Sequence, residues 1–136
     1  MKISVDKIKL TFTNAFEGRA AGPNGEVLIG SQPGSMKPYH LLFGALGSCF
    51  YATFLSIAEK KRLTFSGAVI EIDGEKREES PATLRQVTID VTIFDPSDEK
   101  QFMRSVELGA KHCSIHETVS KVANIDFRVN FVYTRK

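Results

Sequence analysis

Hydrophobic and polar residues alternate along several stretches of the chain, and this two-residue period predicts β-strands. Ile8, Leu10 and Phe12 alternate with lysines and threonines, as in a strand with one buried face. The sequence GPNG at residues 22–25 predicts a turn, and a second strand is expected at residues 26–30. Further strands are expected at residues 65–73, 84–94 and 125–133, of which the last two alternate strongly.

The longest apolar segment has a helical period instead. It begins at Pro38, whose missing N–H suits the first turn of a helix, and we expect it to end near Arg62. Two rows of residues four positions apart form an apolar stripe: Leu41, Ala45, Cys49, Thr53 and Ile57, and Leu42, Leu46, Phe50, Phe54 and Ala58. A third row contains small residues only: Gly44, Ser48, Ala52 and Ser56. Because few other helices are expected, this smooth row predicts packing against a second copy by two-fold symmetry.

Two shorter helices are expected near the C-terminus. Ser97 is the predicted N-cap of the first, in which Phe102, Val106 and Ala110 recur at helical spacing. Ser114 and Glu117 have the spacing of a capping box, which predicts a break near residue 112 and a new helix from residue 115. The order of strands and helices indicates an α+β fold with helices on antiparallel sheet, in one domain over residues 1–136.

Composition narrows the functional classes. The chain has 136 residues, of which 42% are hydrophobic and 25% charged, as in a soluble globular domain. The net charge of +2 gives no reason to expect a nucleic-acid or membrane partner. Residues 41–58 lack charge and reach the lower length limit of a membrane span, but their glycines and hydroxyls favour a buried helix. Two cysteines without a secretory signal predict a cytoplasmic protein.

The two cysteines are the candidate chemistry. Cys49 lies among small residues on the long helix, where a cysteine is often an inert core residue. Cys113 lies at a predicted helix start, whose positive end favours a thiolate, so the residues alone indicate Cys113 as the more acidic thiol. If the two meet, one can be oxidised to a sulfenic acid that the other converts to a disulfide. A zinc site is the alternative, with ligands drawn from the group His112, Cys113, His116 and either Cys49 or His40.

Both cysteine segments resemble those of the OsmC/Ohr family of osmotically induced and organic hydroperoxide resistance proteins. The residues are PYHLLFGALGSCF at 38–50 and CSIHETV at 113–119. The resemblance implies an OsmC-like fold: antiparallel sheets wrapped around a long central helix, in an intertwined homodimer with thiols near the subunit interface. It also implies that Cys49 attacks the peroxide and Cys113 resolves it.

The same resemblance suggests further site residues. Arg19 approximately matches the arginine that holds the thiolate in peroxidase members, and Tyr39 stands where they usually carry a glutamate. Glu17 is a possible replacement for that carboxylate. An apolar pocket built from both subunits implies substrate contacts from Tyr39, Phe43 and Phe50, and suits alkyl hydroperoxides over hydrogen peroxide.

The sequence therefore predicts a thiol peroxidase that reduces organic hydroperoxides through Cys49 and Cys113. It is expected to need a dithiol reductant and no cofactor, to form a homodimer, and to bind neither nucleic acid nor membrane. Two alternatives remain. One is an OsmC-like redox or small-molecule-binding protein without efficient peroxidase activity, and the other is a Cys/His zinc-stabilised module.

Overall fold

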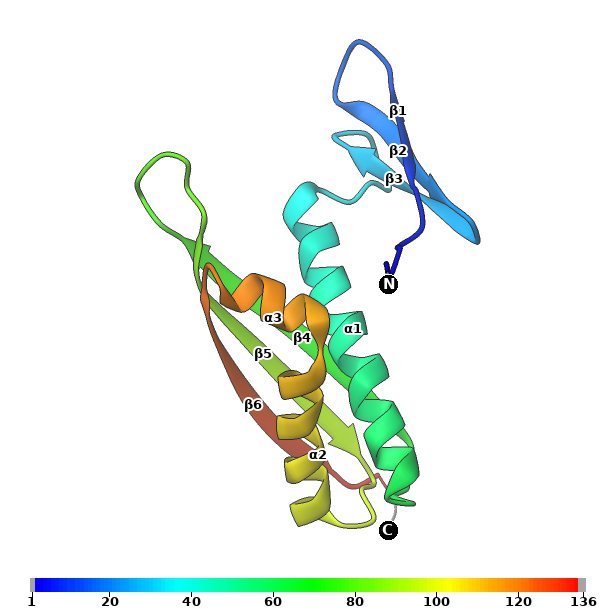
Figure 1. Ribbon diagram of the computed structural model, residues 1–136, viewed down its shortest axis with the longest axis vertical. Coiled ribbons are helices and arrows are strands. Elements are labelled where there is room, and N and C mark those ends of the chain that lie inside the picture. Colours follow the sequence, from blue (N-terminus) through cyan, green and yellow to red (C-terminus); the bar gives the residue numbers. More distant parts are fainter. Residues whose placement is uncertain (1, 135–136) are drawn as a thin grey trace. The chain divides into compact units, whose positions relative to one another are not determined.

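The computed structural model describes residues 2–134 and has an α+β architecture (Figure 1). The chain divides into two compact units, Met1–Phe43 and Gly44–Lys136. The long helix α1, Pro38–Lys60, begins in the first unit and continues into the second. The single domain expected over residues 1–136 stays a prediction.

The first unit contains a three-stranded antiparallel sheet. Its strands are β1 (Lys9–Phe12), β2 (Glu17–Gly22) and β3 (Gly25–Gly30), in the order β1-β2-β3. The predicted turn at residues 22–25 is confirmed as the β2–β3 hairpin, in which Gly22 pairs with Gly25. Strand β2 was not predicted, because its residues EGRAAG are mostly small and lack a clear alternation.

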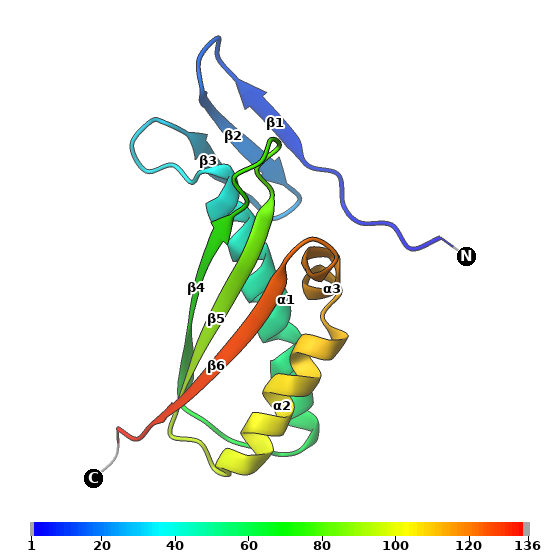
Figure 2. The ribbon, with the colours of Figure 1, turned by 90° about the vertical axis from the view of Figure 1, so that its left-hand side faces the viewer.

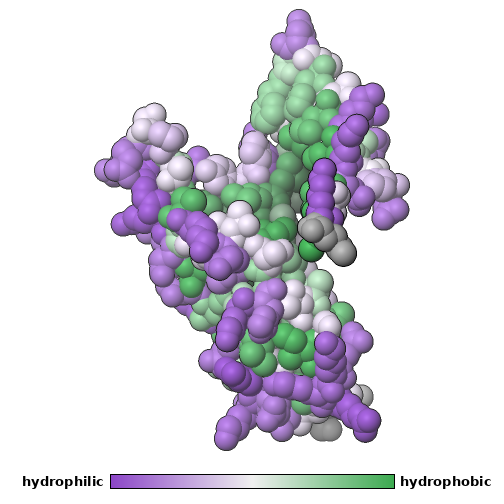
Figure 3. All heavy atoms as spheres, viewed as in Figure 1, coloured by the Kyte–Doolittle hydropathy of each residue, from purple (hydrophilic) through white to green (hydrophobic). Residues whose placement is uncertain are grey.

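One face of this sheet is apolar and uncovered by the rest of its unit. Leu10 pairs with Ala20 and Ala20 with Val27, so their side chains share a face. The expectation of a half-buried strand around residues 8–12 is wrong for the single chain, since Leu10 is 48% exposed and Phe12 is 44% exposed. Hydrophobic residues gather on the sheet in the space-filling view (Figure 3). An apolar hollow of about 520 Å³ is lined by Ile8, Leu10, Val27, Ile29 and Leu41 among others.

The second unit contains a mixed three-stranded sheet. It consists of β4 (Gly67–Lys76), β5 (Leu84–Phe94) and β6 (Asn124–Val132), in that order. The β4–β5 pair is antiparallel, as expected, but β5 and β6 are parallel. This pairing departs from the expected antiparallel sheet because the two helices between β5 and β6 carry the chain back to the same end.

Helices cover one face of this sheet (Figures 1 and 2). Besides α1, they are α2 (Glu99–His112) and the short α3 (Ser114–Ser120). The covered face of β5 presents Val87, Ile89, Val91 and Ile93, all at most 1% exposed. Phe50 and Phe54 of α1 and Phe102 of α2 are all buried in this core, where the Phe54 and Phe102 ring centroids are 6.0 Å apart.

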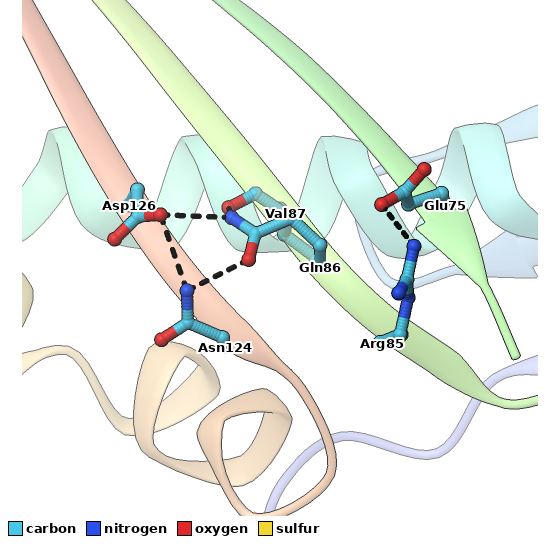
Figure 4. Close-up of polar contacts among 6 residues, drawn as sticks. All are labelled: Glu75, Arg85, Gln86, Val87, Asn124 and Asp126. Atoms are coloured by element: carbon cyan, nitrogen blue, oxygen red, sulfur yellow. Dashed lines mark hydrogen bonds and ion pairs between the residues drawn. The ribbon is translucent and has the colours of Figure 1, made fainter.

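The opposite face of the sheet is polar. The Gln86 side-chain amide of β5 donates to the Asp126 carboxylate at 3.0 Å, and the Asn124 side-chain amide donates to Gln86 Oε1 at 2.7 Å (Figure 4). Arg85 forms an ion pair with Glu75 of the neighbouring strand (Figure 4). These contacts join adjacent strands across the surface and complete the alternation of apolar and polar positions.

The three rows predicted on the long helix have three levels of burial. The row of Leu46, Phe50, Phe54 and Ala58 is buried, the row that includes Cys49 is half-buried, and the small-residue row is exposed. The Ser48 hydroxyl donates to the Gly44 carbonyl at 2.7 Å, so this polar group is satisfied within the helix. By length and hydropathy alone α1 could cross a membrane, but the core helix of a soluble protein meets the same criteria.

Both predicted N-caps are displaced by one residue. Asp98, and not Ser97, caps α2 by accepting a hydrogen bond from the Gln101 N–H at 3.1 Å. The Ser97 hydroxyl oxygen accepts instead from the Thr64 N–H at 3.0 Å. The capping box of Ser114 and Glu117 is also wrong, because α3 begins at Ser114 and its N-cap is Cys113.

Candidate functional site

The two cysteines meet in the second unit. Cys49 comes from the half-buried row of α1, and Cys113 is the single residue between α2 and α3. The two thiols lie close enough for each to shift the pKa of the other, and the Cys113 thiol lowers the pKa of Cys49. Cys113 is 1% exposed, whereas Cys49 is half-buried. The fold thus brings together two sulfurs that are 64 positions apart in the chain (113 − 49).

Cys113 is held in place by the helix that follows it. Its backbone is extended, with φ −84° and ψ 117°, and its Sγ accepts a hydrogen bond from the His116 N–H at 3.3 Å. This bond is that of an N-cap, with sulfur in place of the usual oxygen. The break between α2 and α3 therefore aims the Cys113 side chain inward, and its position near residue 112 confirms the expected helix end.

The pKa of Cys49 is lowered below its ordinary value. Burial raises this pKa, but the donors around the sulfur outweigh it. The donors are the Cys113 thiol, the Ile115 backbone N–H, and the hydroxyl and backbone N–H of Ser114. The last three come from the first residues of α3. Cys49 is therefore the sulfur at which a thiolate is favoured.

The pKa of Cys113 is raised instead. Burial is the main cause, and the hydrogen bond to Cys49 adds to it, while the His116 N–H acts in the opposite direction. The expectation that Cys113 is the more acidic thiol is therefore wrong. That expectation was based on the helix start alone, but the backbone N–H groups of Ser114 and Ile115 at this start lower the pKa of Cys49. The pair consists of one sulfur suited to attack and one that keeps its proton.

His116 lies beside the pair and was considered in the sequence only as a possible zinc ligand. Its ring stacks on Phe127 of β6, with centroids 5.7 Å apart and planes at 25°. Burial lowers the pKa of His116, although the nearby Glu117 carboxylate raises it. Among residues 2–134, no three side chains of His, Cys, Asp or Glu are placed to hold a metal ion.

Ser114 and Ile115 are the site residues that sequence reasoning missed. Ser114 was assigned to a capping box, and Ile115 carries no side-chain chemistry. Their role depends on the approach of α3 to α1, which local spacing does not encode. One signal in the sequence could have pointed to these residues. Two consecutive helices need an extended residue between them, so Cys113 becomes the N-cap of the second helix. The next two N–H groups are then left for another acceptor.

The contacts described for the other predicted site residues are with residues other than the two cysteines. Arg19 lies on β2 in the first unit, where it forms an ion pair with Glu26 at 3.8 Å on an exposed surface. Tyr39 and Phe43 begin α1 and meet edge to face, with centroids 6.3 Å apart. Phe50 is fully buried and packs on Phe127 at 4.9 Å, so its ring belongs to the core. Their contacts with substrate stay predictions.

Comparisons with known proteins agree with this architecture. Residues 30–128 match the family described as OsmC-like protein. A relative from Mycoplasma genitalium described as hydroperoxide reductase is 25% identical over 123 residues, covering 85% of each chain.

Solved structures show the same fold. An OsmC-like protein from Mycoplasma pneumoniae has a TM-score of 0.84 at 19% identity, covering 95% of this chain and 98% of the other. An organic hydroperoxide resistance protein from Legionella pneumophila has a TM-score of 0.73 at 10% identity, covering 96% and 99%. The predicted OsmC-like α+β fold is thereby confirmed.

Proposed function

The chain belongs to the OsmC-like protein family, and we propose that it is a thiol-dependent peroxidase for organic hydroperoxides. The family and the hydroperoxide reductase relative support a redox or peroxidase role. The finer assignment, with Cys49 as the attacking thiolate and Cys113 as the resolving thiol, rests on one observation. The two thiols are neighbours with opposite pKa shifts: the pKa of Cys49 is lowered, in part by the Cys113 thiol, while the pKa of Cys113 is raised.

In the first step the Cys49 thiolate attacks the terminal oxygen of the hydroperoxide. The O–O bond breaks, Cys49 becomes a sulfenic acid, and the remaining oxygen leaves as an alkoxide that must gain a proton. The Cys113 thiol is positioned beside Cys49 to supply this proton. The products are an alcohol and a Cys113 thiolate.

In the second step the Cys113 thiolate attacks the sulfur of the Cys49 sulfenic acid. A disulfide forms, and the hydroxyl leaves as water after taking up one proton. A dithiol then reduces the disulfide by exchange and is itself oxidised to a disulfide, which restores both thiols. No cofactor enters this cycle.

The experiment is turnover of cumene hydroperoxide by the purified protein with an excess of a dithiol. We expect steady consumption by the unaltered protein, none by Cys49→Ser, and a single turnover by Cys113→Ser that stops at the sulfenic acid. A sulfenic acid trap such as dimedone then labels Cys49 in Cys113→Ser only. Equal turnover by Cys49→Ser and the unaltered protein overturns the assignment.

We further propose that the protein is a homodimer. The supporting observations are the exposed small-residue row of α1 and the exposed apolar face of the β1–β3 sheet. Exposed apolar areas of this kind mark interaction surfaces. A second copy covering them would supply the apolar walls of a substrate pocket, for which Tyr39 and Phe43 are the candidate residues. A reducing compartment, the cytoplasm, suits a pair that must be returned to thiols.

Tyr39 favours a second candidate function. Peroxidase members usually carry a glutamate at this position, and its absence here is consistent with an OsmC-like redox or binding protein without efficient turnover. Such a protein would still form the Cys49–Cys113 disulfide with one equivalent of hydroperoxide, but would show no sustained consumption with a dithiol. The turnover assay therefore separates the two candidates.

A further inference from the structure

The cap of α3 and the resolving thiol are the same sulfur atom. Cys113 Sγ accepts a hydrogen bond from the His116 N–H at 3.3 Å, and the same side chain lies close enough to Cys49 to lower its pKa. We propose that oxidation of the pair to a disulfide removes the sulfur acceptors that hold the first turn of α3, so that this turn opens and exposes the disulfide to its reductant. The inference rests on the proposed function, since it requires the Cys49–Cys113 disulfide.

The first argument concerns the acceptors. In the reduced protein the His116 N–H donates to Cys113 Sγ at 3.3 Å, and the backbone N–H groups of Ser114 and Ile115 lower the pKa of Cys49. These are orphan donors of the helix start, which need partners. A disulfide has no thiolate, and its S–S bond of about 2.05 Å and its dihedral angle fix both side chains. Cys113 then turns toward Cys49 and away from the His116 N–H.

The second argument concerns the length of α3. This helix has only seven residues, Ser114–Ser120, of which Val119 is buried. Helices of one or two turns have little stability of their own and depend on caps and packing. The loss of the cap therefore affects a large share of what holds this helix, whereas the fourteen-residue α2 keeps its Asp98 cap.

The third argument concerns access. The dithiol must reach one sulfur of the disulfide in line, and Cys113 is 1% exposed in the reduced protein. Attack on the Cys113 sulfur would be slow if it stayed equally buried, which would leave only the half-buried Cys49 sulfur open to the dithiol. Opening of the α3 start uncovers Cys113 only when a reductant is needed, and reduction restores the acceptors and closes the turn. The buried reduced form also keeps Cys113 from wasteful oxidation.

The test is amide hydrogen exchange at residues 114–117 in the unaltered protein, reduced and after stoichiometric oxidation with diamide. Diamide takes two electrons from the two thiols and becomes a hydrazine, so the comparison does not depend on peroxidase activity. We expect exchange of the His116 amide to become about five- to tenfold faster on oxidation, the range expected for loss of a helix cap. The amides of β5 should not change.

Two variants make the comparison specific. Cys113→Ser keeps an N-cap acceptor but cannot form the disulfide, so its His116 amide should be protected before and after diamide. Cys113→Ala has no acceptor and should exchange quickly without any oxidant. Because Cys113 is buried, the folding of the Cys113→Ala variant is checked by the protection of the β5 amides.

Three results would overturn the proposal. They are unchanged protection in the oxidised unaltered protein, protection in Cys113→Ala equal to that of the reduced protein, and persistence of both free thiols after diamide. The last result would also remove the cysteine pair of the proposed function. In contrast, faster exchange on oxidation together with no consumption of cumene hydroperoxide would support the opening and contradict the peroxidase assignment alone.

Discussion

At the scale of single residues, the site is explained by which sulfur receives hydrogen bonds. A thiol in a packed helix row is usually inert because burial raises its pKa. Cys49 differs because the first residues of α3 and the Cys113 thiol lower its pKa as hydrogen-bond donors, against the effect of burial. The segment around it is rich in small residues, and Gly47 allows the Ile72 side chain to approach closely.

The first prediction concerns the acidity of Cys49. We expect its alkylation by iodoacetamide to reach half its maximal rate below about pH 8.5, the value of a free cysteine. Cys113→Ala removes the thiol donor and should shift this midpoint upward, whereas Cys113→Ser keeps a donor and should shift it less. Arg19→Ala tests the role proposed for that arginine and should also raise the midpoint. A midpoint at or above 8.5 in the unaltered protein contradicts the thiolate.

Part of this site could be predicted from the sequence. The resemblance of two short segments singled out both cysteines and suggested the roles proposed for them, because each segment is continuous in the chain. The donors Ser114 and Ile115 could not be predicted, since they serve a sulfur more than sixty positions away. For the same reason the helix start alone suggested the wrong thiol as the more acidic one.

At the scale of secondary structure elements, the core depends on the close approach of α1 and α2. Gly109 of α2 lies against Phe54, so that a Cβ at this position would be 3.1 Å from the Phe54 Cβ and 3.2 Å from its Cα. Gly47 of α1 is also close to a neighbour, but a Cβ there would lie 3.0 Å from the flexible Cδ1 end of Ile72. The two glycines therefore differ in how easily the neighbour can move.

The second prediction uses this difference. Gly109→Ala should destabilise the protein, because the helix backbone of α1 must shift at a cost of about 1–3 kcal/mol. The higher helix propensity of alanine offsets about 1 kcal/mol of this cost. Gly47→Ala is the matched control, and there a small movement of Ile72 leaves stability unchanged or slightly higher. Urea unfolding of both variants measures the difference. Equal stability of the two would show that the helices do not pack so tightly at Gly109.

The third prediction concerns the pH dependence of α3. Burial lowers the pKa of His116 in the folded state, so the unfolded chain binds this proton more readily. The stabilising contribution of the neutral His116 side chain is fully present above the unfolded pKa of about 6.5, and it is lost as the pH falls through the folded pKa. Stability should therefore decline below about pH 6.5.

His116→Phe is the control for this effect, because it keeps an aromatic ring against Phe127 but cannot bind a proton. Urea unfolding at several pH values should show a flatter profile for this variant between pH 7 and 5. If both proteins lose stability in parallel over this range, His116 is not the titrating group.

Element boundaries were predictable to within a few residues where apolar periodicity was strong. The strand at 84–94 and the helix from Pro38 are examples, since both bury one face. The N-caps were displaced because Ser97 and Asp98, like Cys113 and Ser114, are adjacent residues that can both accept a hydrogen bond. The parallel β5–β6 pair could not be inferred, because it depends on where two helices pack.

At the scale of the whole molecule, two surfaces are exposed although the pattern of residues in the sequence predicts that they are buried. Ile8, Leu10 and Phe12 have the alternation of a strand with a covered face, and the small-residue row of α1 has no polar side chain longer than serine. Neither surface is covered within its own unit of the single chain. The proposed dimer would cover both.

The fourth prediction tests this dimer. Ser48→Phe places a bulky ring in the smooth row and should dissociate or destabilise the protein, because overpacking a tight contact costs about 1–3 kcal/mol. Lys100→Phe on the exposed first turn of α2 adds the same ring elsewhere and should remain dimeric. Light scattering measures both. A stable monomer for the unaltered protein contradicts the dimer, whatever the variants do.

The central claim is that one hydroperoxide molecule converts the two thiols of one chain into a disulfide. The most direct measurement is a thiol count and intact mass after one equivalent of cumene hydroperoxide, under denaturing conditions without reductant. The account predicts two free thiols before and none after, a loss of two hydrogen masses, and no cross-linked chains. It is contradicted by two remaining thiols, by disulfides between chains, or by a sulfonic acid at Cys49 beside an unmodified Cys113.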